Sequence, residues 1–199
     1  MTIAGRSIMP RRLVLVAICL VMLPGGALAG DPTDQIRADI DELYRVARAT
    51  PPSGSTVDRE ADAILDRMFD WSRMAESSLR GHWKQRSPAE RAEFTKLFAG
   101  LFRRAYVSKI NVIDATKFEY LSESVEGERA TVKTRVYSKK GTAINVDYVT
   151  RRGDGGRWHI EDVRVEGISL VDNYRTQFDS IIGRSSYAGL LDKLRGAAK

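Results

Sequence analysis

The spacing of hydrophobic residues divides the chain into two helical regions with a region of strands between them. In the first region, apolar residues recur at three- and four-residue intervals, the period that places them on one face of a helix. This pattern predicts four helices before the strands, over residues 34–49, 57–68, 70–83 and 88–110. A loop-forming stretch, "TPPSGS" at 50–55, separates the first two.

The last of these four helices has the clearest start signal. Ser87, Pro88 and Glu90 stand in the order of a capping box with proline at the first helical position. Apolar side chains then recur along one face of the helix: Phe94, Leu97, Phe98, Leu101, Phe102, Ala105 and Tyr106. We therefore expect this helix to present an aromatic-rich face to the interior of the protein.

From Thr116 onward, the period of the hydrophobic pattern changes to two, which is typical of half-buried strands. Strands are predicted at "KFEYLSES", "RATVKTRVYS", "TAINVDYVTR" and "RWHIEDVRVE". Only short stretches such as "VEGE", "KKG" and "RGDGG" connect them. Four strands joined by short turns form an antiparallel meander.

The fourth strand contains a change of phase. Trp158 and Ile160 point to one face, whereas Val163 and Val165 have the opposite parity. A β-bulge near residues 161–162 would restore a common face and bend the sheet. We therefore expect a curved sheet.

A helical pattern follows the fourth strand almost directly, in "GISLVDNYRTQFDSII" at 167–182. Ser169 is an N-cap candidate for a helix over 170–182, and a short helix is predicted over 187–194. The sequence therefore predicts one α+β domain, a curved four-stranded antiparallel meander wrapped by N- and C-terminal helices.

The N-terminus has the pattern of a secretory signal peptide. Arg11 and Arg12 precede an apolar run over 13–23, and "ALA" at 27–29 supplies a cleavage site. We expect cleavage after Ala29, which leaves residues 30–199 as the exported, mature domain. The sole cysteine, Cys19, would be lost with residues 1–29.

Cleavage also lowers the charge. The segment 1–29 holds three of the 32 Lys and Arg side chains and none of the 26 acidic ones, so the formal charge falls from +6 to +3. Such a mild and well-mixed charge in an exported protein makes nucleic acid an unlikely partner.

Motifs of known chemistry are absent from the sequence. It contains no G-x-S-x-G, no H-E-x-x-H and no phosphate-binding loop, and the two histidines, His82 and His159, are not spaced as metal ligands. We therefore expect no catalytic residue, no metal and no cofactor. If the sheet encloses a pocket, Asp147 or Asp162 could serve as a general base, and Asp147 is the better candidate.

Two stretches, "FDWSRMAESSLRGHWKQRSPAERAEFTKLFAGLFRRAYVSKI" at 69–110 and "WHIEDVRVEGISLVDNYRTQF" at 158–178, resemble the MlaC-like family of periplasmic phospholipid-binding proteins. The matching positions in the first stretch are Gly81, Trp83, Ser87, Pro88, Phe94, Phe98 and Tyr106. Those in the second are Trp158, Ile160, Asp162, Val163, Gly167, Ile168, Ser169, Leu170, Tyr174, Arg175 and Phe178. The hopanoid-associated branch of the family is similar as well, and both branches stay open.

The resemblance implies an NTF2/cystatin-like fold and a lipid carrier rather than an enzyme. Members of the family carry a diacyl phospholipid, its tails buried in an apolar cavity. They move it between an outer-membrane lipoprotein complex and an inner-membrane MCE-domain complex of an ABC transporter. We expect a monomer that takes part in such a pathway.

Large inward-facing side chains are the candidates for contact with the lipid tails. They are Phe98, Phe102, Tyr106, Phe118, Tyr120, Val132, Ile144, Val146, Tyr148, Trp158, Ile160, Tyr174 and Phe178. In this interpretation the strand of Trp158 and the helix of Tyr174 and Phe178 form two walls of one pocket, joined by a turn at Gly167. Arg175 would bind a neighbouring acid, such as Asp162, or a lipid phosphate.

Two rivals stay open beside the carrier. One is a small-molecule enzyme on an NTF2-like fold, which would need a carboxylate such as Asp147 inside a compact pocket. The other is a non-binding adaptor whose core is filled. The residue types alone do not separate a filled core from a lined cavity.

Overall fold

A computed structural model describes residues 31–48, 55–107 and 115–197. The predicted signal peptide, the loop around 50–54 and the predicted helix end at Ile110 lie outside these residues. None of the helices in the described part of the chain is long and apolar enough to cross a membrane.

Helices form at both ends of the described chain, as predicted. Before the sheet come α1 (Pro32–Arg48), α2 (Ser55–Met68), α3 (Trp71–Leu79), the 3₁₀ helix η1 (Arg80–Gln85), α4 (Pro88–Phe102) and the π turn η2 (Arg103–Val107). After it come α6 (Leu170–Arg184) and α7 (Tyr187–Ala197). The capping box is confirmed, because the Ser87 hydroxyl accepts from Glu90 N–H and the Glu90 carboxylate accepts from Ser87 N–H.

The sheet is an antiparallel meander in which each strand pairs with the next along the chain. Its strands are β1 (Ala115–Glu126), β2 (Arg129–Ser138), β3 (Ala143–Arg152), β4 (Trp158–Val165) and β5 (Ile168–Ser169). The prediction of four strands is therefore wrong by one. The chain folds back after β4, and its next two residues pair with the end of that strand.

The predicted bulge in the fourth strand is confirmed. Val149 of β3 pairs with Asp162 and the next residue, Thr150, pairs with Ile160, so Glu161 is the extra residue on β4. The bulge brings Ile160 and Val163 into the same hydrophobic core despite their opposite parity.

A two-residue turn joins β4 to β5. Glu166 and Gly167 have φ values of +50° and +78°, and Val165 pairs with Ile168 across them. Positive φ at both central residues is the requirement of a type I′ hairpin turn. Ser169 then caps α6 by accepting from Asp172 N–H at 3.0 Å. This tight hairpin explains how a helix can begin directly after a strand.

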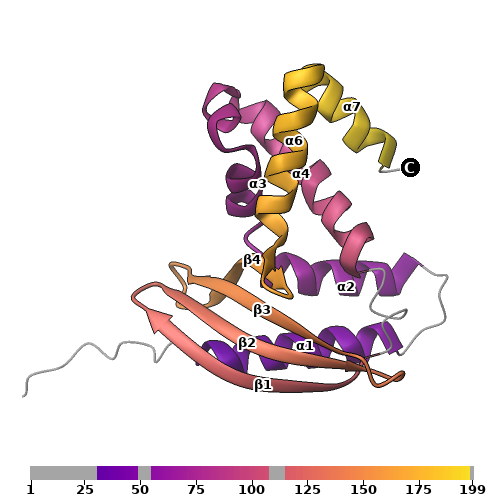
Figure 1. The fold of residues 1–199 in the computed structure, drawn as a ribbon, viewed down its shortest axis with the longest axis vertical. Helices are drawn as coiled ribbons and strands as arrows, with labels where there is room; N and C mark the ends of the chain where they lie inside the picture. Colours follow the sequence, from indigo (N-terminus) through magenta and orange to yellow (C-terminus); the bar gives the residue numbers. More distant parts are fainter. Residues whose placement is uncertain (1–30, 49–54, 108–114, 198–199) are drawn as a thin grey trace, which may run out of the picture.

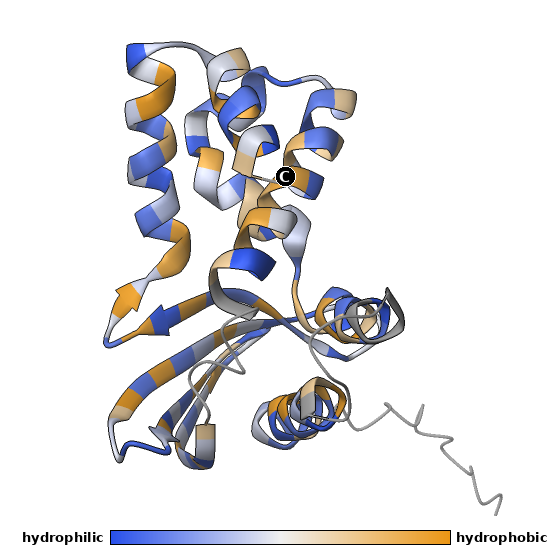
Figure 2. Ribbon diagram, turned by 90° about the vertical axis from the view of Figure 1, so that its right-hand side faces the viewer, coloured by the Kyte–Doolittle hydropathy of each residue, from blue (hydrophilic) through white to orange (hydrophobic). Residues whose placement is uncertain are grey.

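The elements form two parts. Helices α1 and α2 lie on the same face of the curved sheet, and α3, α4, α6 and α7 form a separate bundle at one side of it (Figures 1 and 2). Contacts between α6 and β4, and between α3 and β4, join the bundle to the sheet.

A buried ion cluster fixes α1 to α2 and to the start of β4. The Asp39 carboxylate is only 4 % exposed and accepts from Arg157 at 2.5 and 2.6 Å and from Arg67 at 3.4 Å. A buried carboxylate is stable only when it is paired in this way. The cluster therefore holds both helices in place across the sheet.

Candidate functional site

An apolar cavity of about 530 Å³ lies between the curved sheet and the first two helices. Its lining residues come from α1, α2, all five strands and the ends of α4 and α6. They are Ile40, Leu43, Tyr44, Leu65, Met68, Phe69, Phe102, Phe118, Val136, Ile144, Val146, Tyr148, Val163, Val165, Glu166, Ile168 and Leu170. This volume is typical of a small-molecule or lipid site. Among the described residues, the lining is apolar apart from the Glu166 carboxylate and the hydroxyls of Tyr44 and Tyr148.

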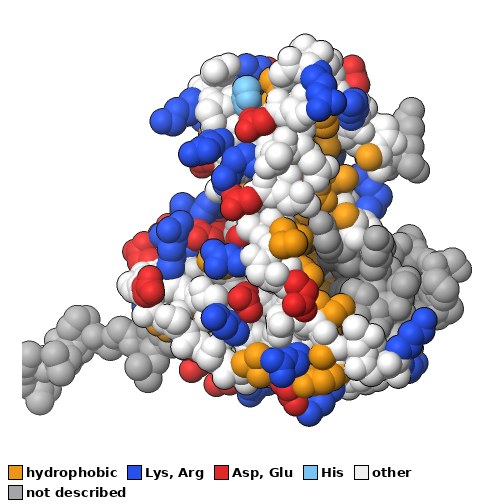
Figure 3. All heavy atoms as spheres, in the orientation of Figure 1, with side chains coloured by type: hydrophobic (Ala, Val, Ile, Leu, Met, Phe, Trp, Pro, Cys, Tyr) orange, Lys and Arg blue, Asp and Glu red, His pale blue; other side chains and the backbone are white. Residues whose placement is uncertain are grey.

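Among the described residues, the cavity is buried at one end and reaches the surface at the other. Leu65 and Met68 are each 2 % exposed, whereas Ile168 is 63 % exposed. The mouth therefore lies beside the β4–β5 hairpin. Apolar side chains also reach the molecular surface between the bundle and the sheet, with charged groups on both sides (Figure 3).

Five of the residues predicted from the sequence line the cavity. Phe102 ends α4, Phe118 lies on β1, and Ile144, Val146 and Tyr148 alternate along β3. The three β3 residues share a face because successive strand side chains point to opposite sides of the sheet. Their contact with a lipid stays a prediction.

The other predicted aromatic residues of α4 and α6, Phe98, Tyr174 and Phe178, lie elsewhere. Phe98 packs against Tyr174 at 5.5 Å and Phe178 at 6.2 Å between ring centroids, and the three side chains are at most 6 % exposed. They fill the core of the helical bundle and do not border the cavity. The prediction that Trp158, Tyr174 and Phe178 face one pocket is therefore wrong. None of the three lines the apolar cavity, and α6 packs on α3 and α7 with its aromatic face against Phe98 of α4.

The remaining predicted residues are spread around the sheet. Trp158 and Ile160 are fully buried beyond the bulge, Val132 is buried beside Tyr148, and Tyr120 is half-buried on β1. None of these four borders the cavity. The side chain of Tyr106 lies outside the described residues.

Sequence reasoning missed the wall formed by the first two helices. Ile40, Leu43, Leu65 and Met68 belong to their apolar stripes, and Tyr44 adds a ring 5.0 Å from that of Phe118. The helical period marks these residues as inward-facing. The helical period does not show whether the strands opposite these residues pack against them or stay at a distance.

Tyr44 and Tyr148 bring hydroxyl groups to the cavity wall, and Tyr120 lies near Tyr148 without bordering the cavity. Burial raises the pKa of Tyr148 above its ordinary value, and the nearby hydroxyls of Tyr120 and Tyr44 add to the shift. Burial also raises the pKa of Tyr120 to about 12. These hydroxyls are therefore neutral at physiological pH and can act as hydrogen-bond partners, not as bases.

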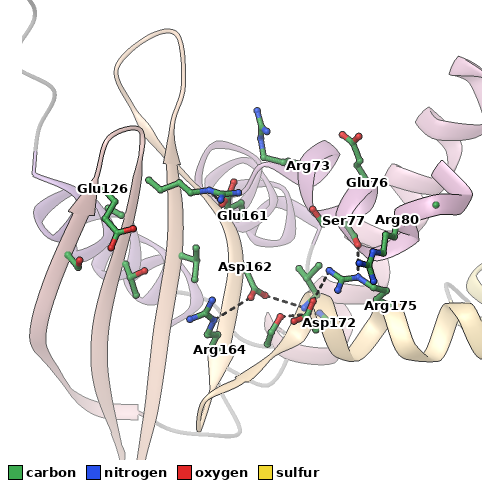
Figure 4. A pocket seen from close by; sticks show the side chains of 18 of the residues that line it. Arg73, Glu76, Ser77, Arg80, Glu126, Glu161, Asp162, Arg164, Asp172 and Arg175 are labelled. Carbon is green, nitrogen blue, oxygen red and sulfur yellow. Dashed lines mark hydrogen bonds and ion pairs between the residues drawn. The ribbon is translucent and has the colours of Figure 1, made fainter. Parts of the chain in front are cut away.

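A second, polar groove of about 850 Å³ lies between the sheet and the α3 and α6 helices (Figure 4). Arg175 donates to Ser77 C=O at 3.0 Å and forms an ion pair with Asp172 at 2.7 Å. Asp162 accepts from Val171 N–H at 3.2 Å, and burial raises its pKa. No lining residue is shared with the apolar cavity, so Arg175 links α6 to α3 in the polar groove and does not line the cavity.

The candidate general base lies outside the cavity lining. Asp147 follows the cavity-facing Val146 on β3 and does not line the cavity. Within the described ranges, no group of three or more His, Cys, Asp or Glu side chains is placed to hold a metal ion. The geometry is that of a binding cavity.

The sequence matches the family described as MlaC protein over residues 39–196. The chain belongs to the MlaC family. The match spans α2 to α6 in full and most of α1 and α7, so it includes both the cavity and the helical bundle. No curated protein sequence matches this MlaC protein.

A solved structure of similar fold is the phospholipid-binding protein from Ralstonia solanacearum in complex with a phospholipid. It superposes on this MlaC protein with a TM-score of 0.75 and 20 % sequence identity, covering 85 % of this chain and 97 % of its own. The likeness confirms the α+β architecture.

Proposed function

We propose that this MlaC protein binds a diacyl phospholipid with its acyl chains in the apolar cavity. The observation that carries the proposal is the cavity itself, open at one end and lined by apolar and aromatic side chains. Support comes from the MlaC family match and from the similarly folded Ralstonia protein, which binds a phospholipid.

The free energy of transferring acyl chains into the cavity suits a lipid carrier. Removing a methylene group from water gains about 0.8 kcal/mol, so one long acyl chain gains on the order of 10 kcal/mol before the costs of binding. Moving the same chain from a bilayer gains little, because both surroundings are apolar. Such a cavity retains a lipid in water and still releases it to a membrane, without any catalytic group.

The carrier would work in the periplasm. Residues 1–29 have the pattern of a cleaved signal peptide. We infer that the loaded protein moves between an outer-membrane lipoprotein complex and an inner-membrane MCE-domain complex of an ABC transporter. Members of the MlaC-like family act in such a pathway, and the resemblance of this sequence to them supports the inference.

A substitution that fills the cavity tests the proposal. Val146 lies on the cavity wall and is half-buried, so Val146→Trp should lower uptake of a fluorescent phospholipid from vesicles at least tenfold. The matched control is Val125→Trp on β1, where the valine is 47 % exposed and outside the cavity lining. Equal uptake by both folded variants would contradict the proposed site.

A further inference from the structure

The headgroup of a bound lipid would lie beside the β4–β5 hairpin. This step rests on the proposed function, because acyl chains in the buried end of the cavity leave the polar end of the lipid at the mouth. Glu166 and Ile168 border the mouth, and both side chains are exposed. The chemistry of this hairpin therefore decides which headgroups are favoured.

Among the described residues that line the cavity, Glu166 is the single charged one. Its carboxylate accepts from Asn145 N–H at 2.6 Å and from the Asn145 side-chain amide at 3.3 Å. No Lys, Arg or His of the described chain forms an ion pair with it. Its negative charge is thus held in place and is uncompensated by a cation in direct contact.

The backbone at Glu166 gives a second, independent reason to ask for a ligand. The first central position of a type I′ turn favours Asn, Asp or Gly, because its φ is positive. Glu166 occupies this position with φ +50°. Residues that break a local rule in this way cluster at functional sites.

We propose that Glu166 makes the cavity prefer lipids whose headgroup carries an ammonium group over lipids with a net negative headgroup. An ammonium at the mouth would contact the carboxylate, whereas an anionic headgroup would meet a like charge. Because the side chain is exposed, water screens the interaction, and the preference should be about two- to fivefold.

The hydrogen bonds between Glu166 and Asn145 make it possible to separate a role of Glu166 in lipid selection from a structural role. The carboxylate takes the place of a backbone acceptor for Asn145 at the point where β4 turns away from β3. Glu166→Gln keeps an oxygen that can accept the same hydrogen bond but removes the charge. A purely structural Glu166 predicts that this variant has unchanged lipid selection.

The experiment offers the full mature protein vesicles of equimolar phosphatidylethanolamine and phosphatidylglycerol and weighs the complexes by native mass spectrometry. We expect the wild type to carry about two- to fivefold more phosphatidylethanolamine. Glu166→Gln should carry the two lipids equally, and Glu166→Lys should favour phosphatidylglycerol. Glu126→Gln, which removes a carboxylate bordering the polar groove, should keep the wild-type ratio.

Each outcome decides between the two claims. If the wild type binds both lipids equally, or Glu166→Gln keeps the wild-type ratio, the inference is overturned while the carrier function stands. If neither lipid binds, the proposed function fails first. Should Glu166→Gln not fold, Glu166→Asn, which suits the turn, provides the same loss of charge.

Discussion

The helical bundle and the cavity are built from the same kinds of residue, yet one is filled and the other is open. In the bundle, Phe94, Phe98 and Phe178 touch ring to ring and are at most 3 % exposed. Around the cavity, Phe118 and Tyr148 stay half-buried and leave about 530 Å³ between the sheet and its covering helices.

The difference arises from how the covering elements are joined. Helices α3, α4, α6 and α7 pack on one another, so ridges of side chains fill the grooves between them. Helices α1 and α2 pack mainly on each other and touch the curved sheet at a few points, including the Asp39 ion cluster. A bent sheet under two helices held in this way leaves space that side chains do not fill.

The largest predicted effect tests this contrast directly. Phe98→Ala should lower the free energy of unfolding by about 3–5 kcal/mol, because it opens a void in a filled core. Ile144→Ala should lower it by about 1 kcal/mol or less, because the residue lines a space that is already open. Urea unfolding of the lipid-free protein measures both values.

The same two substitutions should affect lipid retention in the opposite order. Folded Phe98→Ala should keep its lipid, whereas Ile144→Ala should release lipid faster. If both substitutions destabilise the protein equally, the cavity is collapsed in solution and the contrast is wrong.

A smaller effect is expected where the bundle adjoins the polar groove. Arg80 has φ +47° at the junction of α3 and η1, a backbone conformation that favours glycine. Arg80→Gly should therefore raise the free energy of unfolding by about 1 kcal/mol. Arg73→Gly within α3 should lower it by about 1 kcal/mol, which makes it a control of opposite sign. If Arg80→Gly and Arg73→Gly lower the free energy of unfolding equally, the contacts of the Arg80 side chain stabilise the protein by more than its positive φ destabilises it.

The smallest predicted effect is a pH dependence. Burial raises the folded-state pKa of Asp162, so its ionisation is penalised in the native protein only. This penalty is absent below the unfolded-state pKa, grows as the pH rises from the unfolded-state to the folded-state pKa, and is complete above the folded-state pKa. Asp162→Asn should therefore gain thermal stability relative to the wild type as the pH is raised from about 3 to 7. A constant difference between the two melting temperatures would contradict this assignment.

Much of the fold follows from the sequence, because helix caps and strand alternation are local. The predicted strand "RATVKTRVYS" is β2 without change, and Ser87 and Ser169 cap the expected helices. The short β5 was missed because two residues are too few to show a period. The bulge at Glu161 was visible because it shifts the phase of the residues on either side.

The site followed from the sequence only in part. Alternation identifies Phe118, Ile144, Val146 and Tyr148 as inward-facing, and all four line the cavity. The rich aromatic face of α4 suggested a binding wall, but Phe98 meets α6 instead. Apolar periodicity shows which side chains leave water. Which apolar surfaces stay apart depends on tertiary packing.

Lipid binding by this protein can be decided by native mass spectrometry of the wild type purified from the periplasm. We expect a complex heavier than the chain by the mass of one diacyl phospholipid, with the lipid recovered by solvent extraction. A hopanoid in its place would keep the carrier and change its ligand. An empty protein that also takes up no phospholipid from vesicles would contradict the account.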